Sequence, residues 1–289
     1  AVARPRLGIH LEVETGLGRG GVREADLATA ANAIAAAPGL RLAGVWTHLQ
    51  APEDQARTTA QLERFDAAAG ILRRAGHRLP NRHVAASSGL LLGNAAALDG
   101  VRPGLTVYGL VPDELLGSEV PGGPTLKPVL SLHARPVRVV DLPVGWGIGY
   151  GPSFTTARPS RIATLPLGYG DGWPRTLSNR ADALVRGRRV PLVGNVAMDA
   201  VMADVTDVPG PPVGVTDEFV LLGAQGSERI TAADLAVARA TNSWEVVTAM
   251  AARLPRVYHA PSGAQGLRTL VSGPGLAGHA ATRRRTNRS

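Results

Sequence analysis

The stretch that decides the fold is Leu7-Gly-Ile-His-Leu-Glu-Val13, a strand-like run that leads into the glycine-rich turn Glu14-Thr-Gly-Leu-Gly-Arg-Gly-Gly21. Apolar residues then recur at helical spacing within residues 24–37, and Pro38-Gly39 ends that pattern. A strand, a turn and a helix in this order form the repeating unit of parallel α/β folds. This segment therefore predicts one such unit.

Further units follow along the chain. Residues 42–48 are strand-like and residues 53–75 have the apolar stripe of a helix. Two shorter strands, 82–86 and 100–102, enclose a helix predicted over 88–96. Counted together, these patterns predict four strand and helix units with a parallel sheet.

The pattern changes after about Pro124, where short strands alternate with Gly, Pro and Asp. The predicted strands cover residues 128–141, 161–168, 182–193, 196–205 and 217–222. Residues 185–190 are typical of a hairpin turn. Thr231-Ala-Ala-Asp234 is a capping box that opens a helix over 232–240, and a second helix is predicted over 243–252. This second region is predicted to be mostly β.

Composition narrows the class of protein. The chain has 289 residues, of which 44% are hydrophobic and 19% charged, which is typical of a globular protein large enough for two domains. No apolar run approaches the roughly 18 residues that a membrane span needs, and the start lacks the apolar core of a signal peptide, so we expect a cytoplasmic protein. The absence of cysteine excludes disulfides, cysteine metal sites and cysteine nucleophiles.

The net charge of +8 could suggest nucleic-acid binding, but its distribution argues against that partner. Residues 268–289 contain five arginines and no acidic residue, which leaves the rest of the chain nearly balanced. We interpret residues 272–289 as a disordered basic tail, with an anion-binding arm as the alternative. Neither nucleic acid nor a membrane is expected as a partner.

Polar groups follow the predicted strands of the first region. His48, His83, Ser87 and Arg102 all lie at or just beyond strand ends, and the turn around Arg19 could hold an anion. For either histidine alone, a structural role is the alternative. Because the carboxyl ends of parallel strands lie at one edge of a sheet, these groups indicate a single site.

The second region offers polar groups beside glycines in irregular segments. These are Tyr150 in Gly-Tyr-Gly, Tyr169 in Gly-Tyr-Gly-Asp-Gly, and Asp199 after Met198. Taken alone, loop tyrosines are commonly surface or core-edge residues, and we expect Met198 to be a core residue. No convincing Ser/His/Asp, HExxH or P-loop arrangement is present.

The order of these segments resembles the alanine racemase family over residues 7 to about 258. The run from His10 to Arg19 is similar to the family segment whose arginine contacts the cofactor phenolate and the substrate carboxylate. His48 matches the histidine that flanks the cofactor's pyridine ring. His83-Val-Ala-Ala-Ser87 resembles the segment whose serine holds the phosphate.

The remaining motifs continue that resemblance. Val101-Arg102-Pro-Gly104-Leu105 resembles the segment that places an arginine against the pyridine nitrogen, with backbone donors at Gly104 and Leu105. Tyr150 matches the catalytic tyrosine and Tyr169 the second active-site tyrosine. Met198 matches the residue whose amide contacts the substrate carboxylate.

The resemblance implies a pyridoxal 5'-phosphate enzyme that interconverts L- and D-alanine for cell-wall precursors. Such a racemase makes the substrate Cα proton labile, removes it from one face and returns a proton on the other. The family acts as a homodimer, with Tyr150 reaching across the interface and with His48 and Arg19 as candidates to lower its pKa. An arginine such as Arg102 keeps its proton, which favours racemisation over transamination.

Several positions depart from the family pattern. Glu12 stands where many relatives carry a lysine converted to an anionic carbamate, and it would supply the same negative charge to Arg19 directly; an ordinary solvated glutamate is the alternative. Ala86 replaces an asparagine and Ala197 a position that often carries cysteine. Ala252 lies near the place of a phosphate-contacting tyrosine.

The largest departure is the cofactor-binding lysine. The family carries it at the end of the first barrel strand, whereas the single lysine of this sequence, Lys127, aligns with the entry to the β domain. A complete barrel takes about 250 residues. We therefore expect an incomplete (β/α)8 TIM-type barrel, about its last four β/α units, in residues 1–122. A mostly β C-terminal domain would follow in residues 123–271, ahead of the tail.

The expected activity follows from that gap. We expect a fragment without its Schiff-base lysine, inactive alone, in preference to a working half-enzyme. One alternative is a non-catalytic relic or binding subunit with the same fold. Another is a racemase of serine or other amino acids.

Overall fold

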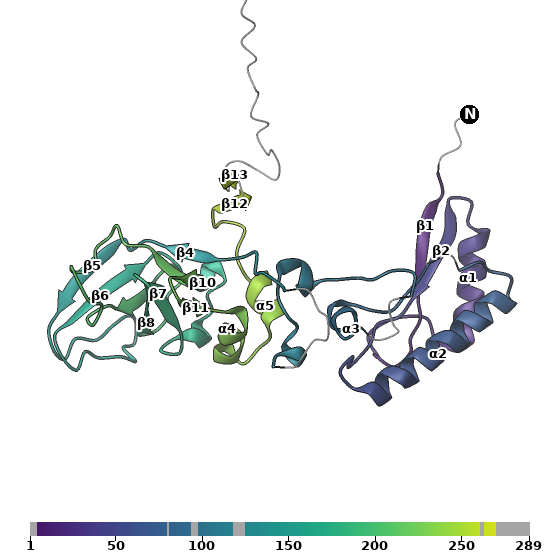
Figure 1. Cartoon of the computed structure of the whole chain (residues 1–289), viewed down its shortest axis with the longest axis horizontal. Helices are drawn as coiled ribbons and strands as arrows, with labels where there is room; N and C mark the ends of the chain where they lie inside the picture. Colours follow the sequence, from purple (N-terminus) through teal and green to yellow (C-terminus); the bar gives the residue numbers. More distant parts are fainter. Residues whose placement is uncertain (1–4, 80, 94–97, 118–124, 261–262, 270–289) are drawn as a thin grey trace, which may run out of the picture. The chain divides into compact units, whose positions relative to one another are not determined.

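A computed structural model of the chain describes residues 5–79, 81–93, 98–117, 125–260 and 263–269. The chain divides into two compact units, residues 1–129 and 130–289, which are considered separately (Figure 1). The boundary predicted between residues 122 and 123 and the predicted tail over 272–289 both lie outside the described residues.

A three-stranded parallel sheet organises the first unit. Its strands, in spatial order, are β1 (Leu7–Glu12), β2 (Leu40–Trp46) and β3 (Arg82–His83). The strand predicted over residues 100–102 is reduced to a single parallel bridge between His83 and Gly100. Because the strands are parallel, their carboxyl ends lie at one edge of the sheet, as the sequence predicted.

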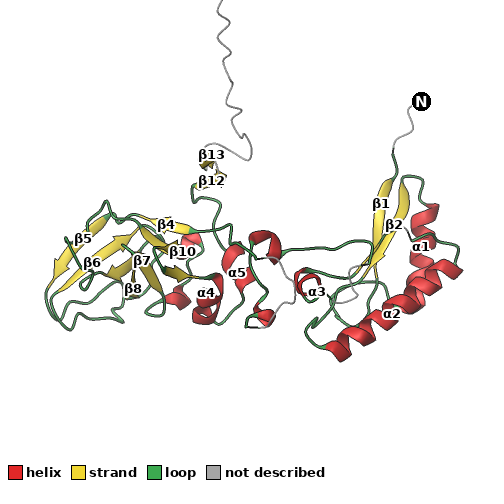
Figure 2. Cartoon of the chain, viewed as in Figure 1, coloured by secondary structure: helices red, strands yellow, loops and turns green. Residues whose placement is uncertain are grey.

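The helices α1 and α2 pack beside this sheet (Figure 2). The helical segments of the unit are η1 (Glu24–Asp26), α1 (Leu27–Ala36), α2 (Gln55–Arg74), α3 (Ser87–Leu91), η2 (Leu105–Tyr108) and η3 (Asp113–Leu115). The side chain of Asp54 caps α2 by accepting a hydrogen bond from the amide of Arg57 at 3.0 Å. The helix predicted over 88–96 is confirmed only as far as Leu91, and residues 94–97 lie outside the described residues.

The alternation of β1 separates the core from the site. Leu11 and Val13 face the helices and pack with Val45, Phe65 and Leu72 in the apolar core. Because successive strand residues point to opposite faces, the intervening polar residues of β1 lie on the other face of the sheet. That face carries the candidate site.

The second unit contains an eight-stranded antiparallel arrangement with the order β11-β10-β7-β8-β9-β6-β5, in which β4 also pairs with β10. The strands are β4 (Leu132–Ala134), β5 (Arg138–Leu142), β6 (Ser160–Leu165), β7 (Asp182–Val185), β8 (Arg188–Val193), β9 (Val201–Asp204), β10 (Phe219–Gln225) and β11 (Glu228–Ile230). The short helical segments are η4 (Tyr169–Asp171), η5 (Arg175–Leu177), α4 (Ala232–Arg239) and α5 (Ser243–Thr248). A separate hairpin joins β12 (Arg256–Ala260) and β13 (Gly263–Arg268).

Local sequence signals of this unit are confirmed. Arg186 and Gly187 join β7 to β8 with φ values of 51° and 71°, the left-handed conformation that a tight hairpin turn requires. The capping box of Thr231 and Asp234 begins α4. No helix in the described part of the chain is both long and apolar enough to cross a membrane.

Phe65 tests the packing of the first unit. Its side chain is 1% exposed, so the Phe65→Ala variant should lose about 3–5 kcal/mol of unfolding free energy through lost burial and the cavity it leaves. Urea denaturation followed by circular dichroism measures this loss. Glu63→Ala, an exposed change on the same helix, is the control and should shift the free energy by no more than about 0.5 kcal/mol. Equal stability of the two variants would contradict the assigned core.

Candidate functional site

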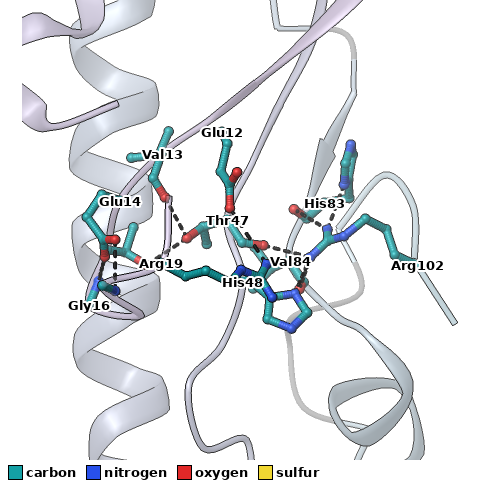
Figure 3. Close-up of polar contacts among 12 residues, drawn as sticks. Glu12, Val13, Glu14, Gly16, Arg19, Thr47, His48, His83, Val84 and Arg102 are labelled. Carbon is teal, nitrogen blue, oxygen red and sulfur yellow. Dashed lines mark hydrogen bonds and ion pairs between the residues drawn. The ribbon is translucent and has the colours of Figure 1, made fainter. Parts of the chain in front are cut away.

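Arg102 is the centre of the polar cluster at the carboxyl edge of the parallel sheet (Figure 3). Its Nη1 donates to the carbonyl oxygen of His83 at 3.0 Å, and its Nη2 donates to the carbonyl oxygens of Thr47 at 2.8 Å and Val84 at 3.0 Å. These carbonyls belong to the ends of β2 and β3. The guanidinium therefore connects the ends of β2 and β3, which the sequence analysis predicted to lie at one edge of the sheet.

Two imidazoles complete the contacts of Arg102. Its Nη1 lies 2.7 Å from Nδ1 of His83 and its Nη2 lies 3.2 Å from Nδ1 of His48. Because an arginine can only donate, Nδ1 of each histidine faces a donor as an acceptor, and both rings are neutral. The two hydrogens of Nη2 serve three acceptors, so the longer contact to His48 shares a hydrogen with a carbonyl. Burial and the Arg102 charge lower the pKa of His83 to about 4, and burial, Arg102 and Arg19 lower the pKa of His48.

The neutral state of His83 also fixes its tautomer. With Nδ1 accepting, the ring proton sits on Nε2, which lies 2.7 Å from Nδ1 of His10 and donates to it. Gly44 makes room for this pair, because a Cβ at that position would lie 2.6 Å from Nδ1 of His10 and 2.5 Å from the carbonyl oxygen of Asn81. The chain Arg102, His83 and His10 is a continuous hydrogen-bonded row.

Charge and ring contacts hold the guanidinium further. Arg102 lies over the Trp46 ring, 4.5 Å from the ring centroid, in a cation–π contact. Burial lowers the pKa of Arg102, whereas the negative charge of Glu12 raises it. Glu12 also lies 4.0 Å from Arg19, whose side chain is 61% exposed and reaches toward His48 (Figure 3). Glu12 thus lies close enough to both arginines to interact with their charges. It is therefore not an isolated solvated glutamate, the alternative considered from the sequence.

The glycine-rich turn before Arg19 differs from the expectation that it could hold an anion. The amide groups of Gly16 and Gly18 donate to the carboxylate of Glu14, at 2.5 Å and 2.9 Å. A local carboxylate therefore already occupies these two donors. For these two amides the anion is the side chain of the preceding glutamate, which folds back onto them, and not an external phosphate or carboxylate.

Ser87 forms a second polar centre at the start of α3. Its hydroxyl is nearly buried, at 4% exposure, and accepts hydrogen bonds from the amides of Gly104 at 2.9 Å and Thr106 at 3.3 Å. The amide of Arg102 donates to the carbonyl oxygen of Ala85 at 2.9 Å, so the two segments run side by side. Gly104 and the buried Leu105 thus lie next to Ser87, as the motif order implied.

A buried polar row beneath the strand ends was missed from the sequence. Gln61 of α2, at 2% exposure, donates from Nε2 to the hydroxyl of Thr15 and to the carbonyl oxygen of His48, both at 3.1 Å. The hydroxyl of Thr47 lies 2.7 Å from that of Thr15 and donates to the carbonyl oxygen of Val13. The available signal was the position of Gln61 on the same face of α2 as the apolar residues Phe65 and Leu72.

The second unit brings Tyr169 and Met198 together. The amide of Tyr169 donates to the carbonyl oxygen of Ala197 at 3.0 Å, and that of Gly170 donates to Met198 at 2.8 Å. Glycine is needed at Gly168, where a Cβ would lie 2.2 Å from the carbonyl oxygen of Ala197. The expectation of a core position for Met198 is wrong: its side chain is 61% exposed, because the segment is held through its backbone.

Asp171 was also missed from the sequence. Its side chain is fully buried, forms an ion pair with Arg253, and accepts a hydrogen bond from the amide of Gly168 at 3.0 Å. The amide of Ala251 donates to its backbone carbonyl at 3.0 Å. Asp171 therefore fixes the loop that carries Tyr169.

His83 should make stability depend on pH. Its pKa is lowered in the folded state, so its contribution is fully present above the ordinary value of 6.5 and is lost as pH falls toward 4, where the unfolded chain takes up the proton first. In His83→Asn, whose amide can accept from Arg102 and donate to His10, the thermal midpoint should fall less over this range. Melting curves from pH 4 to 8 measure the difference. Parallel curves for wild type and variant would contradict the neutral assignment.

Comparison with known proteins supports one family for both units. Residues 1–112 match the family model described as "Alanine racemase, N-terminal domain", and residues 129–258 match "Alanine racemase, C-terminal domain". The alanine racemase of Symbiobacterium thermophilum is 44% identical over 252 residues, which are 86% of this chain and 65% of that relative. The chain thus spans about two thirds of the length of this relative.

Further relatives and solved structures agree. The alanine racemase of Thermobifida fusca is 41% identical over 264 residues, covering 89% of this chain and 68% of the relative. The structure of the Bacillus anthracis alanine racemase with bound L-Ala-P has a TM-score of 0.85 at 29% identity and covers 92% of this chain and 68% of its own. That from Streptomyces lavendulae has a TM-score of 0.80 at 32% identity and covers 89% and 67%. The chain belongs to the alanine racemase family, with the fold that combines an α/β barrel domain and a β domain.

Proposed function

We propose that the protein takes part in the interconversion of L- and D-alanine with pyridoxal 5'-phosphate as cofactor, and so supplies D-alanine for cell-wall precursors. The observation that carries this proposal is the charged Arg102 held between two neutral imidazoles, in a chain whose relatives are named alanine racemases. A fixed cation of this kind suits an aromatic nitrogen that accepts a hydrogen bond and stays unprotonated.

The donor set fits the cofactor. The hydroxyl of Ser87 and the amides of Gly104 and Leu105 would hold the phosphate, with the Gly104 amide exchanging its hydrogen bond to the Ser87 hydroxyl for one to the phosphate. Arg102 would face the ring nitrogen, since among the described residues its Nε–H group has no hydrogen-bond partner. His48 would lie beside the ring. When bound, the cofactor withdraws electrons from the substrate Cα and makes its proton labile.

Arg102 bears on the choice of reaction. Neutral His83 and His48 cannot donate a proton through their Nδ1 atoms, and the guanidinium retains its own protons. The ring nitrogen would then stay largely unprotonated and withdraw electrons less strongly than one paired with an aspartate. That arrangement favours racemisation over transamination.

Residues of both units would act on the substrate. Arg19 and the backbone amide of Met198 would bind its carboxylate, with Tyr169 nearby, and Tyr150 would exchange the Cα proton on one face. Tyr150 is 79% exposed, which leaves its hydroxyl free to serve a site outside its own unit. We propose that it serves the site of a second copy, in a homodimer.

The finer architecture is part of the proposal. The three parallel strands with α1, α2 and α3 would be among the last four β/α units of a (β/α)8 barrel, with residues 1–122 in the barrel and 123–271 in the β domain. The cofactor-binding amine would come from a lysine other than Lys127, whose exposed position follows η3. The second candidate function is a non-catalytic binding protein of the same fold. The observation that favours it is that Lys127 is the single lysine of the sequence.

Borohydride reduction tests the source of the amine. Incubation of the chain with an equimolar amount of pyridoxal 5'-phosphate and then sodium borohydride should label Lys127 only to a small fraction, as read by peptide mass spectrometry, because no residue of the proposed site holds the cofactor beside this exposed side chain. Lys127→Arg is the matched control that keeps the charge. Stoichiometric labelling of Lys127 that is absent from this variant would overturn the assignment.

Tyr150 tests the proton-transfer role. In an enzyme form that carries the cofactor lysine, Tyr150→Phe should abolish exchange of the Cα proton from one alanine enantiomer and leave the cofactor absorbance unchanged, because only the hydroxyl is removed. Proton NMR in D2O measures the exchange. Tyr258→Phe, a change in the separate β12–β13 hairpin, is the control. Equal loss of cofactor and exchange in Tyr150→Phe would contradict a role in proton transfer.

A further inference from the structure

Tyr150 lies in the loop between β5 and β6, and little packing of its side chain fixes its position. The side chain is 79% exposed, and in the described residues no hydrogen bond of its hydroxyl is recorded. Gly149 and Gly151 flank it with φ values of 76° and 51°, so the backbone on both sides is intrinsically adaptable. The position of the phenol therefore depends on what holds the loop backbone.

The base of this loop is fixed, and its tip requires a separate contact. Ile148 is 4% exposed and packs in an apolar cluster with Ile162 and Val193. Its amide donates to the carbonyl oxygen of Phe154 at 2.9 Å, which closes the loop. This closure leaves the tip, with Tyr150, beyond the last backbone pair.

Asn195 supplies the contact at the tip. Its side-chain Nδ2 donates to the carbonyl oxygens of Tyr150 and Gly151, both at 2.9 Å. An amide nitrogen carries two hydrogens, so this one side chain uses both on successive carbonyls of the loop. The backbones are also close here, since a Cβ at Gly149 would lie 3.4 Å from the carbonyl oxygen of Asn195.

Asn195 is itself firmly held. The amide of the preceding Gly194 donates to Oδ1 of Asn179 at 2.6 Å, and the amide of the following Val196 donates to the hydroxyl of Ser178 at 3.0 Å. Two residues further on, the carbonyls of Ala197 and Met198 accept the hydrogen bonds from the Tyr169 loop. One short segment, residues 194–198, thus contacts the loops of both tyrosines.

We propose that Asn195 is the positioning residue of Tyr150, which it aims by donating both amide hydrogens to the loop that carries it. The catalytic importance of this positioning rests on the proposed function. The attachment of the Tyr150 loop to Asn195 does not rest on the proposed function, since it follows from contacts within one unit.

The matched substitution is Asn195→Asp. It keeps the shape of the side chain, removes both donors and sets a carboxylate against two carbonyl oxygens. Asn195→Ala removes the donors without adding charge. The control is Asn242→Asp, because the Asn242 side chain caps α5 by accepting from the amide of Glu245 at 2.9 Å, a role that a carboxylate fills equally well.

The measurement is 19F NMR of the full chain labelled with 3-fluorotyrosine, which contains four tyrosines and gives four assignable signals. In Asn195→Asp and Asn195→Ala, the Tyr150 signal should shift and narrow to the linewidth of a mobile side chain. The Tyr258 signal, from the separate β12–β13 hairpin, should stay unchanged, and an unaltered circular dichroism spectrum reports an intact fold. Asn242→Asp should leave all four signals in place. A Tyr150 signal unaltered in both Asn195 variants would overturn the proposal.

Catalysis separates this inference from the proposed function. In an enzyme form that carries the cofactor lysine, Asn195→Asp should lower kcat about tenfold or more with little change in KM, because a misaimed base slows proton transfer more than binding. If Tyr150→Phe retained full proton exchange, the proposed role of Tyr150 would fail, and the NMR comparison would still decide whether Asn195 holds the loop.

Discussion

The burial of one cation, the guanidinium of Arg102, organises the first unit. A partly buried charge is costly unless it is hydrogen-bonded, and here backbone carbonyls at the ends of β2 and β3, together with two imidazoles, accept from the two Nη atoms. Backbone hydrogen bonds already pair β2 with β3, and the arginine adds a side-chain bridge across their carboxyl ends. Burial lowers the pKa of Arg102, Glu12 on the same face of the sheet partly offsets that shift, and the guanidinium keeps its charge because its intrinsic pKa is so high. Fold and site therefore depend on the same set of contacts.

The second unit also contains a buried charge, here a negative one. Asp171 is fully buried; Arg253 pairs with its charge, and Arg253 and the amide of Gly168 both donate to its Oδ2. This pair holds the Tyr169 loop at its base, while the segment that includes Asn195 contacts both tyrosine loops. In the second unit, a buried ion thus fixes a loop whose tyrosine side chain remains exposed, whereas in the first unit a half-buried ion lies among half-buried histidines. Rigid support beneath exposed polar groups is what a binding site for a small polar molecule requires.

Much of this could be predicted from the sequence, and the exceptions have physical reasons. Periodicity indicated β1, α1 and α2 because one face of each is buried, and the turn at Arg186 and Gly187 is a local signal. The row of Gln61, Thr15 and Thr47 could not be found this way, since its members meet only after folding. Arg253 and Asp171 are 82 positions apart, so their pairing has no local signal either. Met198 misled because an apolar side chain suggests burial, whereas this segment is held by its backbone carbonyls. The roles assigned to Tyr150 and Tyr169 came from resemblance, because nothing in a loop tyrosine itself indicates catalysis.

The protonation state of the two imidazoles beside Arg102 tests most directly whether the guanidinium is held as described. Nitrogen-15 chemical shifts of His48 and His83, recorded on the labelled full chain at pH 6, distinguish the imidazolium from each neutral tautomer. The account predicts that both rings are neutral, with an unprotonated Nδ1 that accepts from Arg102 and a proton on Nε2. An imidazolium at His83, or a proton on its Nδ1, would mean that the arginine is not held as described, and the proposed site would lose its basis.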